Sequence, residues 1–127
     1  MNDKVYYLSH PYTSIGCKSK NLVQSNIIAK SLVQSMDIVI INPLAIVPLV
    51  TQEEDRALEI CKILLKKCDA LILCKGWQLS HGCKCELKWA LEFNIPIYIY
   101  KNGKLKKFKI SKCILSRLKN RWKVGLN

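Results

Sequence analysis

Residues 70–86, "ALILCKGWQLSHGCKCE", join a short apolar run to the start of an amphipathic segment. The run at 70–74 follows Asp69 and is typical of a strand that is buried on both faces of a parallel sheet. Ser80 is a favoured N-cap residue, so we expect a helix that begins there and extends to about Asn94. A buried strand, a loop and a helix in this order form one unit of an α/β fold.

The same alternation precedes this stretch. Residues 4–9 form a β-rich run that ends before Pro11, and residues 20–36 carry apolar side chains at helical spacing. Residues 38–41, "IVII", predict a second buried strand. Residues 44–50, "LAIVPLV", are interrupted by proline and are expected to be irregular.

A further helix is predicted over residues 51–68, where Thr51 and Glu54 have the spacing of a capping box. Downstream of the opening stretch, Pro96 precedes a fourth strand, "IYIY", and "KNGK" predicts a turn. Residues 108–110, "FKI", could add a small fifth strand, and Ser111 is expected to cap a basic terminal helix.

This order predicts an α/β fold in which a parallel sheet of four or five strands is covered by helices on both faces. Ligands bind such sheets at the carboxyl ends of the strands. Three loops should meet there, namely residues 9–14, 42–49 and 75–82. The opening stretch therefore lies where a ligand is expected.

The 127 residues suit one domain, with a core over 4–100 and a basic extension over 101–127. No apolar run is long enough to span a membrane, and the first residues contain no apolar run of signal-peptide length. We therefore expect a soluble, cytoplasmic protein. The seven cysteines are an odd number, and Cys61, Cys68 and Cys74 occupy apolar positions, which favours reduced, buried thiols over a disulfide framework.

The charge is strongly positive and unevenly distributed. The formal net charge is +12, and ten of the 21 basic residues lie between Lys101 and Lys123. Such a field attracts anions, including nucleotides and nucleic acid. Only three of the basic residues are arginine, the side chain favoured for bidentate phosphate and base recognition, so nucleic acid is not the favoured partner.

The predicted helix start can bind an anion beside a carboxylate. The free N–H groups of the first turn and the Ser80 hydroxyl suit a phosphate, and Gly82 allows close approach. Glu86 follows Gly82 by four residues, so both lie on one helix face. This pattern fits a nucleotide whose C1′ atom faces Glu86, which could act as a nucleophile on the sugar. The alternative is a solvated helix glutamate, and Trp77 could equally be a packing residue, a pocket wall or a stacking partner for a base.

A metal site is the other interpretation of this stretch. It would use His81, Cys83 and Cys85, with Cys74 as a further candidate. The spacing lacks the C-x₂-C pairs of zinc modules, and side chains two apart on a helix point in different directions. We therefore expect no metal and no cofactor.

Four segments together resemble the nucleoside 2-deoxyribosyltransferase-like superfamily, most closely its small DUF4406-type proteins. They are "VYYLSHPYT" (5–13), Asn21, "IINP" (40–43) and "CDALILCKGWQLSHGCKCELKWALEFNIPIYIY" (68–100). The resemblance implies a flavodoxin-like (Rossmann-like) sheet and cleavage of N-glycosidic bonds, with Glu86 as nucleophile and Ser80 at the 5′-phosphate of a nucleotide. It also implies a homo-oligomer. The expected substrate-binding residues are Tyr7, Ser9, His10, Pro11, Tyr12, Asn21, Gly76, Trp77, Ser80, His81 and Gly82.

Two positions depart from the pattern of these relatives. His10 stands where they have glycine, and it could supply an acid or a donor. Cys61 stands where many of the enzymes have an aspartate that helps the base to leave. The alternative function is therefore a nucleotide sensor or sequestering protein without catalysis, and the third is nucleic-acid binding through the basic terminal segment.

Overall fold

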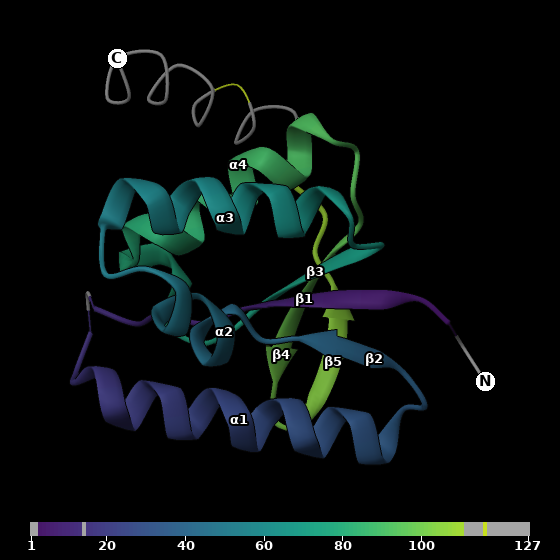
Figure 1. Ribbon diagram of the computed structural model, residues 1–127. Coiled ribbons are helices and arrows are strands. Elements are labelled where there is room, and N and C mark those ends of the chain that lie inside the picture. Colours follow the sequence, from purple (N-terminus) through teal and green to yellow (C-terminus); the bar gives the residue numbers. More distant parts are fainter. Residues whose placement is uncertain (1–2, 14, 111–115, 117–127) are drawn as a thin grey trace.

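The computed structural model describes residues 3–13, 15–110 and 116. A five-stranded sheet forms its centre (Figure 1). The strands are β1 (Val5–Ser9), β2 (Val39–Ile41), β3 (Ala70–Leu73), β4 (Ile97–Lys101) and β5 (Lys104–Lys107). Their order is β2-β1-β3-β4-β5, in which the first four are parallel and β5 runs antiparallel to β4. This is the strand order of flavodoxin-like folds, with β5 reversed.

Helices cover both faces of the sheet. They are α1 (Lys18–Ser35), α2 (Pro43–Val50), α3 (Glu54–Lys66), the short 3₁₀ helix η1 (Trp77–Leu79) and α4 (His81–Glu92). In Figure 1, α1 lies below the sheet and α3 and α4 lie above it. The expected single α/β domain with a mainly parallel sheet is thus confirmed.

The alternation of side chains along the strands produces two cores. On β1, Tyr6 and Leu8 pack with Ile28 and Leu32 of α1. The intervening Tyr7 faces the opposite side, where the cluster includes residues of β3, α3 and α4, among them Leu65, Leu71, Leu73, Leu87 and Ala90. Because strand side chains alternate between faces, Tyr7 and Ser9 both point toward α4.

The segment after β2 differs from expectation. Residues 43–50 form the helix α2 and are not irregular, although Pro48 lies inside it. Pro43 occupies the first turn, where a missing N–H costs nothing, and the helix is only eight residues long. Burial of Pro43 and Val47 outweighs the hydrogen bond that Pro48 cannot donate.

Two other local predictions were wrong. β2 is an edge strand, with Val39 exposed and Ile40 half-buried, so "IVII" is not a strand buried on both faces. The capping box is absent: α3 begins at Glu54 with Glu53 as N-cap, and the Thr51 hydroxyl accepts from the Glu53 N–H at 3.1 Å.

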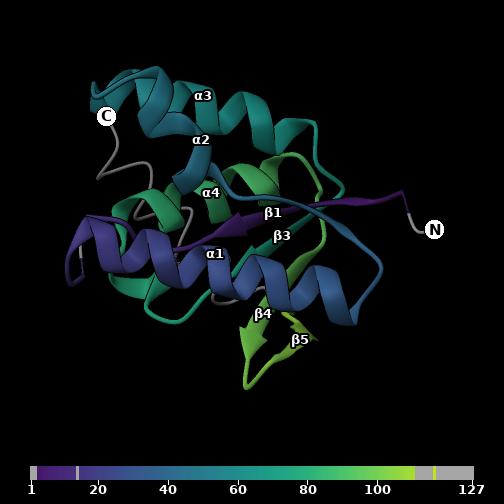
Figure 2. The ribbon, with the colours of Figure 1, turned by 60° about the horizontal axis from the view of Figure 1, so that its bottom comes forward.

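The fifth strand occupies Lys104–Lys107 and not residues 108–110. A tight turn at Asn102-Gly103, where both residues have positive φ, folds it directly back on β4. Figure 2 shows this hairpin at the edge of the sheet. The helix predicted after Ser111 falls outside the described residues, apart from Ser116. Within the part of the chain that is described, no helix is long and apolar enough to cross a membrane.

Candidate active site

Glu86 is a buried carboxylate at the carboxyl end of β1. It lies in the second turn of α4 and is only 7% exposed. The Tyr7 hydroxyl donates a hydrogen bond to its Oε2 atom, and the Ser9 hydroxyl donates to Oε1 at 2.8 Å. Both donors come from β1, 77 and 79 residues earlier in the chain. The sheet therefore fixes a carboxylate that belongs to a helix.

The start of α4 determines where Glu86 lies. Ser80 is the N-cap, as predicted, and its hydroxyl oxygen accepts from the Cys83 N–H at 3.2 Å. Ahead of it, Gly76 adopts φ 89°, a left-handed conformation that lets the chain turn from β3 into η1. A Cβ atom at Gly76 would lie 2.7 Å from Cδ1 of Ile15. The loop after β1 is thus packed directly against the loop after β3.

Burial raises the pKa of Glu86 from 4.5 to about 7, although the hydrogen bonds from Tyr7 and Ser9 oppose this rise. Burial also holds the pKa of Tyr7 well above its ordinary value, with the Glu86 charge as a second cause. Tyr7 therefore stays a donor at neutral pH. Glu86 is a carboxylate poised near neutrality, as expected of a group that must lose a proton before it reacts.

A cavity of about 390 Å³ opens beside Glu86. Its walls come from the β1–α1 loop, α2, the start of α3 and the start of α4. The lining residues are Leu8, His10, Tyr12, Thr13, Lys18, Pro43, Leu44, Val47, Pro48, Thr51, Gln52, Glu54, Ala57, Leu58, Cys61, Ser80, His81, Gly82, Cys83 and Glu86. A pocket of this volume is within the range that holds a small ligand. It lies where the strand order reverses, between β1 and β3, which is the usual ligand position in such sheets.

Six of the twelve predicted site residues line this cavity. They are His10, Tyr12, Ser80, His81, Gly82 and Glu86. Tyr7 and Ser9 do not line it but hold Glu86 in place. The N–H groups of His81 and Gly82 lie in the first turn of α4. N–H groups in the first turn of a helix have no acceptor within the helix. An anion at this end of the cavity would meet free backbone donors.

The other four predicted residues, which include Gly76, shape the loops around the cavity. The Asn21 side chain donates to the Tyr12 and Ile15 carbonyl oxygens at 2.9 and 2.5 Å, so it closes the β1–α1 loop. Pro11 is buried and lies 3.5 Å from the position of a Cβ atom on Gly76. The Trp77 ring packs edge-on against Phe108, with centroids 5.9 Å apart.

Several residues that line the cavity were not predicted from the sequence. The apolar wall is built by α2. Its residues were expected to be irregular, because proline interrupts them, and so no site residue was predicted there. Lys18 is the second such case: it lines the cavity, and its Nζ atom lies 5.7 Å from the centroid of the Tyr12 ring. Lys18 lies ahead of the helix predicted over residues 20–36, so no sequence pattern pointed to it, whereas in the structure it is the first residue of α1.

Cys61 lines the cavity as well and is half-buried, so it is not the fully buried thiol expected from its apolar position. Burial raises the pKa of this thiol to about 11, with the charge of Glu86 as the second cause. The thiol is therefore neutral at physiological pH and cannot replace a carboxylate. All six cysteines in the described ranges are free.

The described residues contain no group of three or more His, Cys, Asp or Glu side chains that could hold a metal ion. His81 and Cys85, two of the candidate ligands, do approach each other, with Nε2 and Sγ 3.6 Å apart. Cys83 is buried.

Comparison with known proteins adds one finding. No curated protein matches the chain. The family model for a domain of unknown function, DUF4406, matches residues 4–99, which include β1 to β3, most of β4, the cavity and Glu86. The chain therefore belongs to the DUF4406 family.

Proposed function

We propose that this protein is a nucleotide N-glycosidase or deoxyribosyltransferase of the nucleoside 2-deoxyribosyltransferase-like superfamily. The observation that carries the proposal is Glu86. It is a buried carboxylate whose two oxygens are held by Tyr7 and Ser9, beside a cavity that begins at a helix N-terminus. Its substrate would be a ribo- or deoxyribonucleoside 5′-monophosphate.

The substrate would lie with its phosphate at the start of α4 and its sugar over Glu86. Free N–H groups and the positive end of the helix dipole favour an anion there, and Lys18 and His81 line the same cavity. The apolar residues of α2 offer a surface for the base. This arrangement would place C1′ of the sugar next to the Glu86 carboxylate.

Ionised Glu86 would attack C1′ as the bond to the base breaks, giving a glycosyl-enzyme intermediate. Water then releases the sugar phosphate in a hydrolase, or a second base accepts it in a transferase. The Tyr7 and Ser9 hydrogen bonds keep the carboxylate in one orientation during attack.

The direct test is release of free base from a panel of ribo- and deoxyribonucleoside monophosphates, measured by chromatography with and without an acceptor base. We expect the wild-type protein to release base and Glu86→Gln to lose at least about 1,000-fold of that rate, because a nucleophile has no substitute. Glu92→Gln is the matched control, since Glu92 ends the same helix and lies away from the cavity lining. Absence of release from every nucleotide, or equal rates for Glu86→Gln and wild type, would disprove the enzyme proposal.

The neutral thiol of Cys61 favours a second candidate, a protein that binds a nucleotide without cleaving it. Such a protein would gain thermal stability with a nucleoside monophosphate, because a ligand that binds only the folded state stabilises it. No base would be released. A melting temperature that no nucleotide changes would reject this candidate.

The β4–β5 hairpin supports the third candidate, nucleic-acid binding. Lys101, Lys104, Lys106 and Lys107 are exposed on it, and Lys109 follows. Binding through these lysines would weaken steeply with salt, because each neutralised phosphate releases counterions. Affinity for DNA or RNA that does not change with salt would exclude it.

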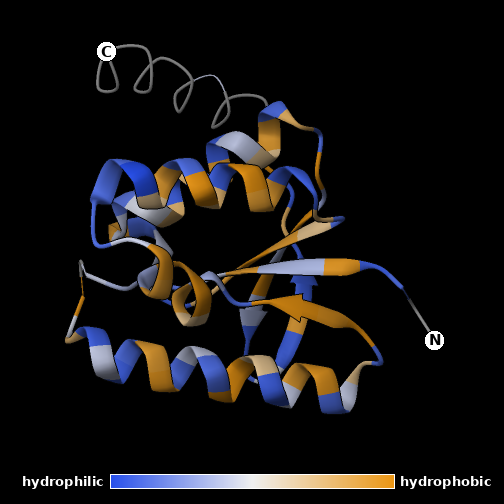
Figure 3. Cartoon of the chain, viewed as in Figure 1, coloured by the Kyte–Doolittle hydropathy of each residue, from blue (hydrophilic) through white to orange (hydrophobic). Residues whose placement is uncertain are grey.

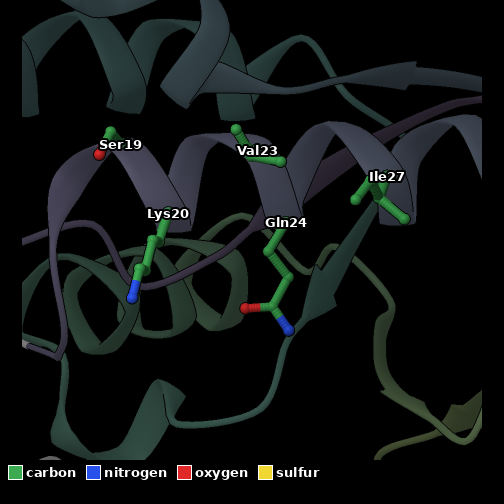
Figure 4. A pocket seen from close by; sticks show the side chains of 5 residues that line it. All are labelled: Ser19, Lys20, Val23, Gln24 and Ile27. Atoms are coloured by element: carbon green, nitrogen blue, oxygen red, sulfur yellow. The ribbon is translucent and has the colours of Figure 1, made fainter.

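We also propose self-association through α2. All eight residues of this helix are nonpolar, and a helix that is apolar on every side is normally buried all round (Figure 3). One side faces the cavity, yet Leu49 and Val50 are 86% and 65% exposed. Eight of the ten large exposed hydrophobic residues in the described ranges fall between Val23 and Val50. They include Val23 and Ile27 in a hollow on the outer side of α1 (Figure 4).

A homo-oligomer fits this surface better than a charged partner, because α2 offers no ionic contact. A second copy of the chain packed on α2 would also support a wall of the cavity.

The free thiols fit a reducing compartment, and we propose a cytoplasmic location for the protein.

A further inference from the structure

The reaction proposed above needs a proton donor, and the inference about His10 rests on that proposed function. Cleavage of a bond between C1′ and a neutral base leaves negative charge on the base unless a proton arrives as the bond breaks. Glu86 is the nucleophile in this scheme and cannot also donate that proton. The Cys61 thiol is too weak an acid for the task.

His10 is a nearly buried imidazole that follows Ser9 directly. It is 8% exposed and lines the cavity. Its Nδ1 atom lies 2.7 Å from the carbonyl oxygen of Pro11. A carbonyl oxygen can only accept, so Nδ1 carries a hydrogen and donates it. This bond orients the ring and leaves Nε2 as the atom that can exchange a proton.

Nε2 of His10 has no hydrogen-bond partner among the described residues. Nε2 is also not sealed from solvent. Among the described residues, only Oδ1 of Asn42 is a buried side-chain nitrogen or oxygen atom without a hydrogen-bond partner. Nε2 is therefore accessible to solvent, and His10 lines the cavity. An imidazole that is more than nine-tenths buried, held by one nitrogen and open at the other, is suited to proton transfer with a bound ligand.

The other candidate donors of the cavity are placed differently. His81 is exposed in the first turn of α4, at the proposed phosphate end, and its Nε2 faces the Cys85 thiol. Glu54 is exposed at the start of α3. Of these ionisable residues, His10 alone directly follows a residue, Ser9, that binds Glu86.

We propose that His10 is the general acid and base of this site. In the first step the imidazolium donates its Nε2 proton to the departing base. The Glu86 oxygen forms a bond to C1′, and the electrons of the broken C1′–N bond stay with the base. In the second step neutral Nε2 removes a proton from water. The water oxygen bonds to C1′, the bond from C1′ to Glu86 breaks, and the imidazolium is restored.

The test compares two leaving groups in a His10→Gln variant. One substrate is a nucleoside 5′-monophosphate with a neutral base, such as guanosine monophosphate. The other has a quaternised base that leaves without a proton, namely N7-methylguanosine monophosphate or, for a single-ring pocket, nicotinamide mononucleotide. Thermal unfolding of the variant establishes that it is folded.

We expect His10→Gln to lower kcat/KM by about 100-fold or more for the neutral base, the usual contribution of general acid catalysis. For the quaternised base the loss should be below about tenfold when bond cleavage limits the rate. His81→Gln should lower both rates by the same factor, because it would act on phosphate binding. Equal losses of His10→Gln on the two leaving groups would overturn the assignment, and so would an unchanged rate on the neutral base.

Failure of the assignment is distinguishable from failure of the proposed function. Absence of base release by the wild-type protein removes the enzyme itself, whereas an active wild type with an unaffected His10→Gln removes only the role of His10. If the wild type accepts neither quaternised substrate, His10→Gly is assayed with added imidazole. A rate on the neutral base that rises with imidazole concentration supports proton transfer, and a flat response overturns it.

Discussion

Glu86 and Tyr7 form one unit at the residue scale. Tyr7 is fully buried, and its hydroxyl donates to one oxygen of a carboxylate that has almost no contact with water. A charged group in such a place is tolerated only when its oxygens accept hydrogen bonds. Tyr7 and Ser9 supply them, and burial keeps the pKa of Glu86 near 7 nonetheless.

Removal of the Tyr7 hydroxyl should affect activity more than stability. We expect Tyr7→Phe to cost about 1 kcal/mol of unfolding free energy, typical of one lost hydrogen bond. It should also lower kcat by about tenfold or more, because Glu86 loses orientation. Tyr6→Phe is the control, since Tyr6 is the neighbouring residue of β1 and packs on the opposite face against Tyr98. A similar loss of kcat in both variants would contradict the role of Tyr7.

The raised pKa of Glu86 predicts a pH dependence of stability. Between about pH 4.5 and 7 the folded protein holds a proton on Glu86 that the unfolded chain has released. Unfolding free energy must therefore fall as pH rises through this window. The total is roughly 3 kcal/mol, since one pKa unit corresponds to about 1.4 kcal/mol.

Glu86→Gln should abolish this part of the pH dependence. Urea unfolding at pH 5 and pH 8 would show the variant gaining stability relative to wild type at the higher pH. Glu92→Gln, near the end of the same helix, should follow the wild-type profile. Parallel profiles for wild type and Glu86→Gln would show that Glu86 titrates at its ordinary pKa.

At the scale of elements, the site depends on how α4 begins. The turn at Gly76 brings the chain from β3 to Ser80, and Ser80 sets the first turn of the helix. Two features restrict Gly76, namely its positive φ and the proximity of Ile15. Both features disfavour any side chain at position 76.

Gly76→Ala should destabilise the protein by more than backbone strain alone. Gly103 has a similar φ of 77°, but a methyl group added there would meet no atom within 4 Å, so Gly103→Ala measures the strain without the contact. We expect a cost of about 1 kcal/mol for Gly103→Ala and about 2 to 4 kcal/mol for Gly76→Ala. Chemical unfolding of the two variants provides the measurement. Equal costs would show that Ile15 moves aside without penalty.

At the scale of the whole molecule, the two sides of the structure differ in chemistry. Exposed lysines occupy the β4–β5 hairpin, whereas eight of the ten large exposed hydrophobic residues in the described ranges lie between Val23 and Val50, on or beside α1, β2 and α2. Lysines on an edge strand discourage pairing with other chains. Association is therefore expected through α2 and not through the hairpin.

Leu49→Asp should shift the protein toward the monomer in sedimentation-velocity experiments, because a buried unpaired charge opposes an apolar contact. Leu79→Asp is the control: Leu79 is 72% exposed but lies on η1, away from α2 in the chain. A wild-type protein that is monomeric at every concentration would contradict self-association. An oligomer that persists in Leu49→Asp would place the interface elsewhere.

The sequence by itself determined the local features of this protein. Apolar runs marked β1 and β3, helical spacing marked α1, and a favoured N-cap residue marked the start of α4 at Ser80. It also singled out Glu86. Each of these signals is contained in a short stretch of chain, where periodicity and capping act directly.

Only the tertiary structure decided what surrounds Glu86. The pairing of β1 with β3 brings Tyr7 and Ser9 to a helix almost 80 residues later, and α2 forms despite Pro48 because Pro43 and Val47 are buried. The edge position of β2 arises in the same way. Contacts between distant segments depend on the packing of the whole chain, which outweighs local preference, and no short pattern encodes them.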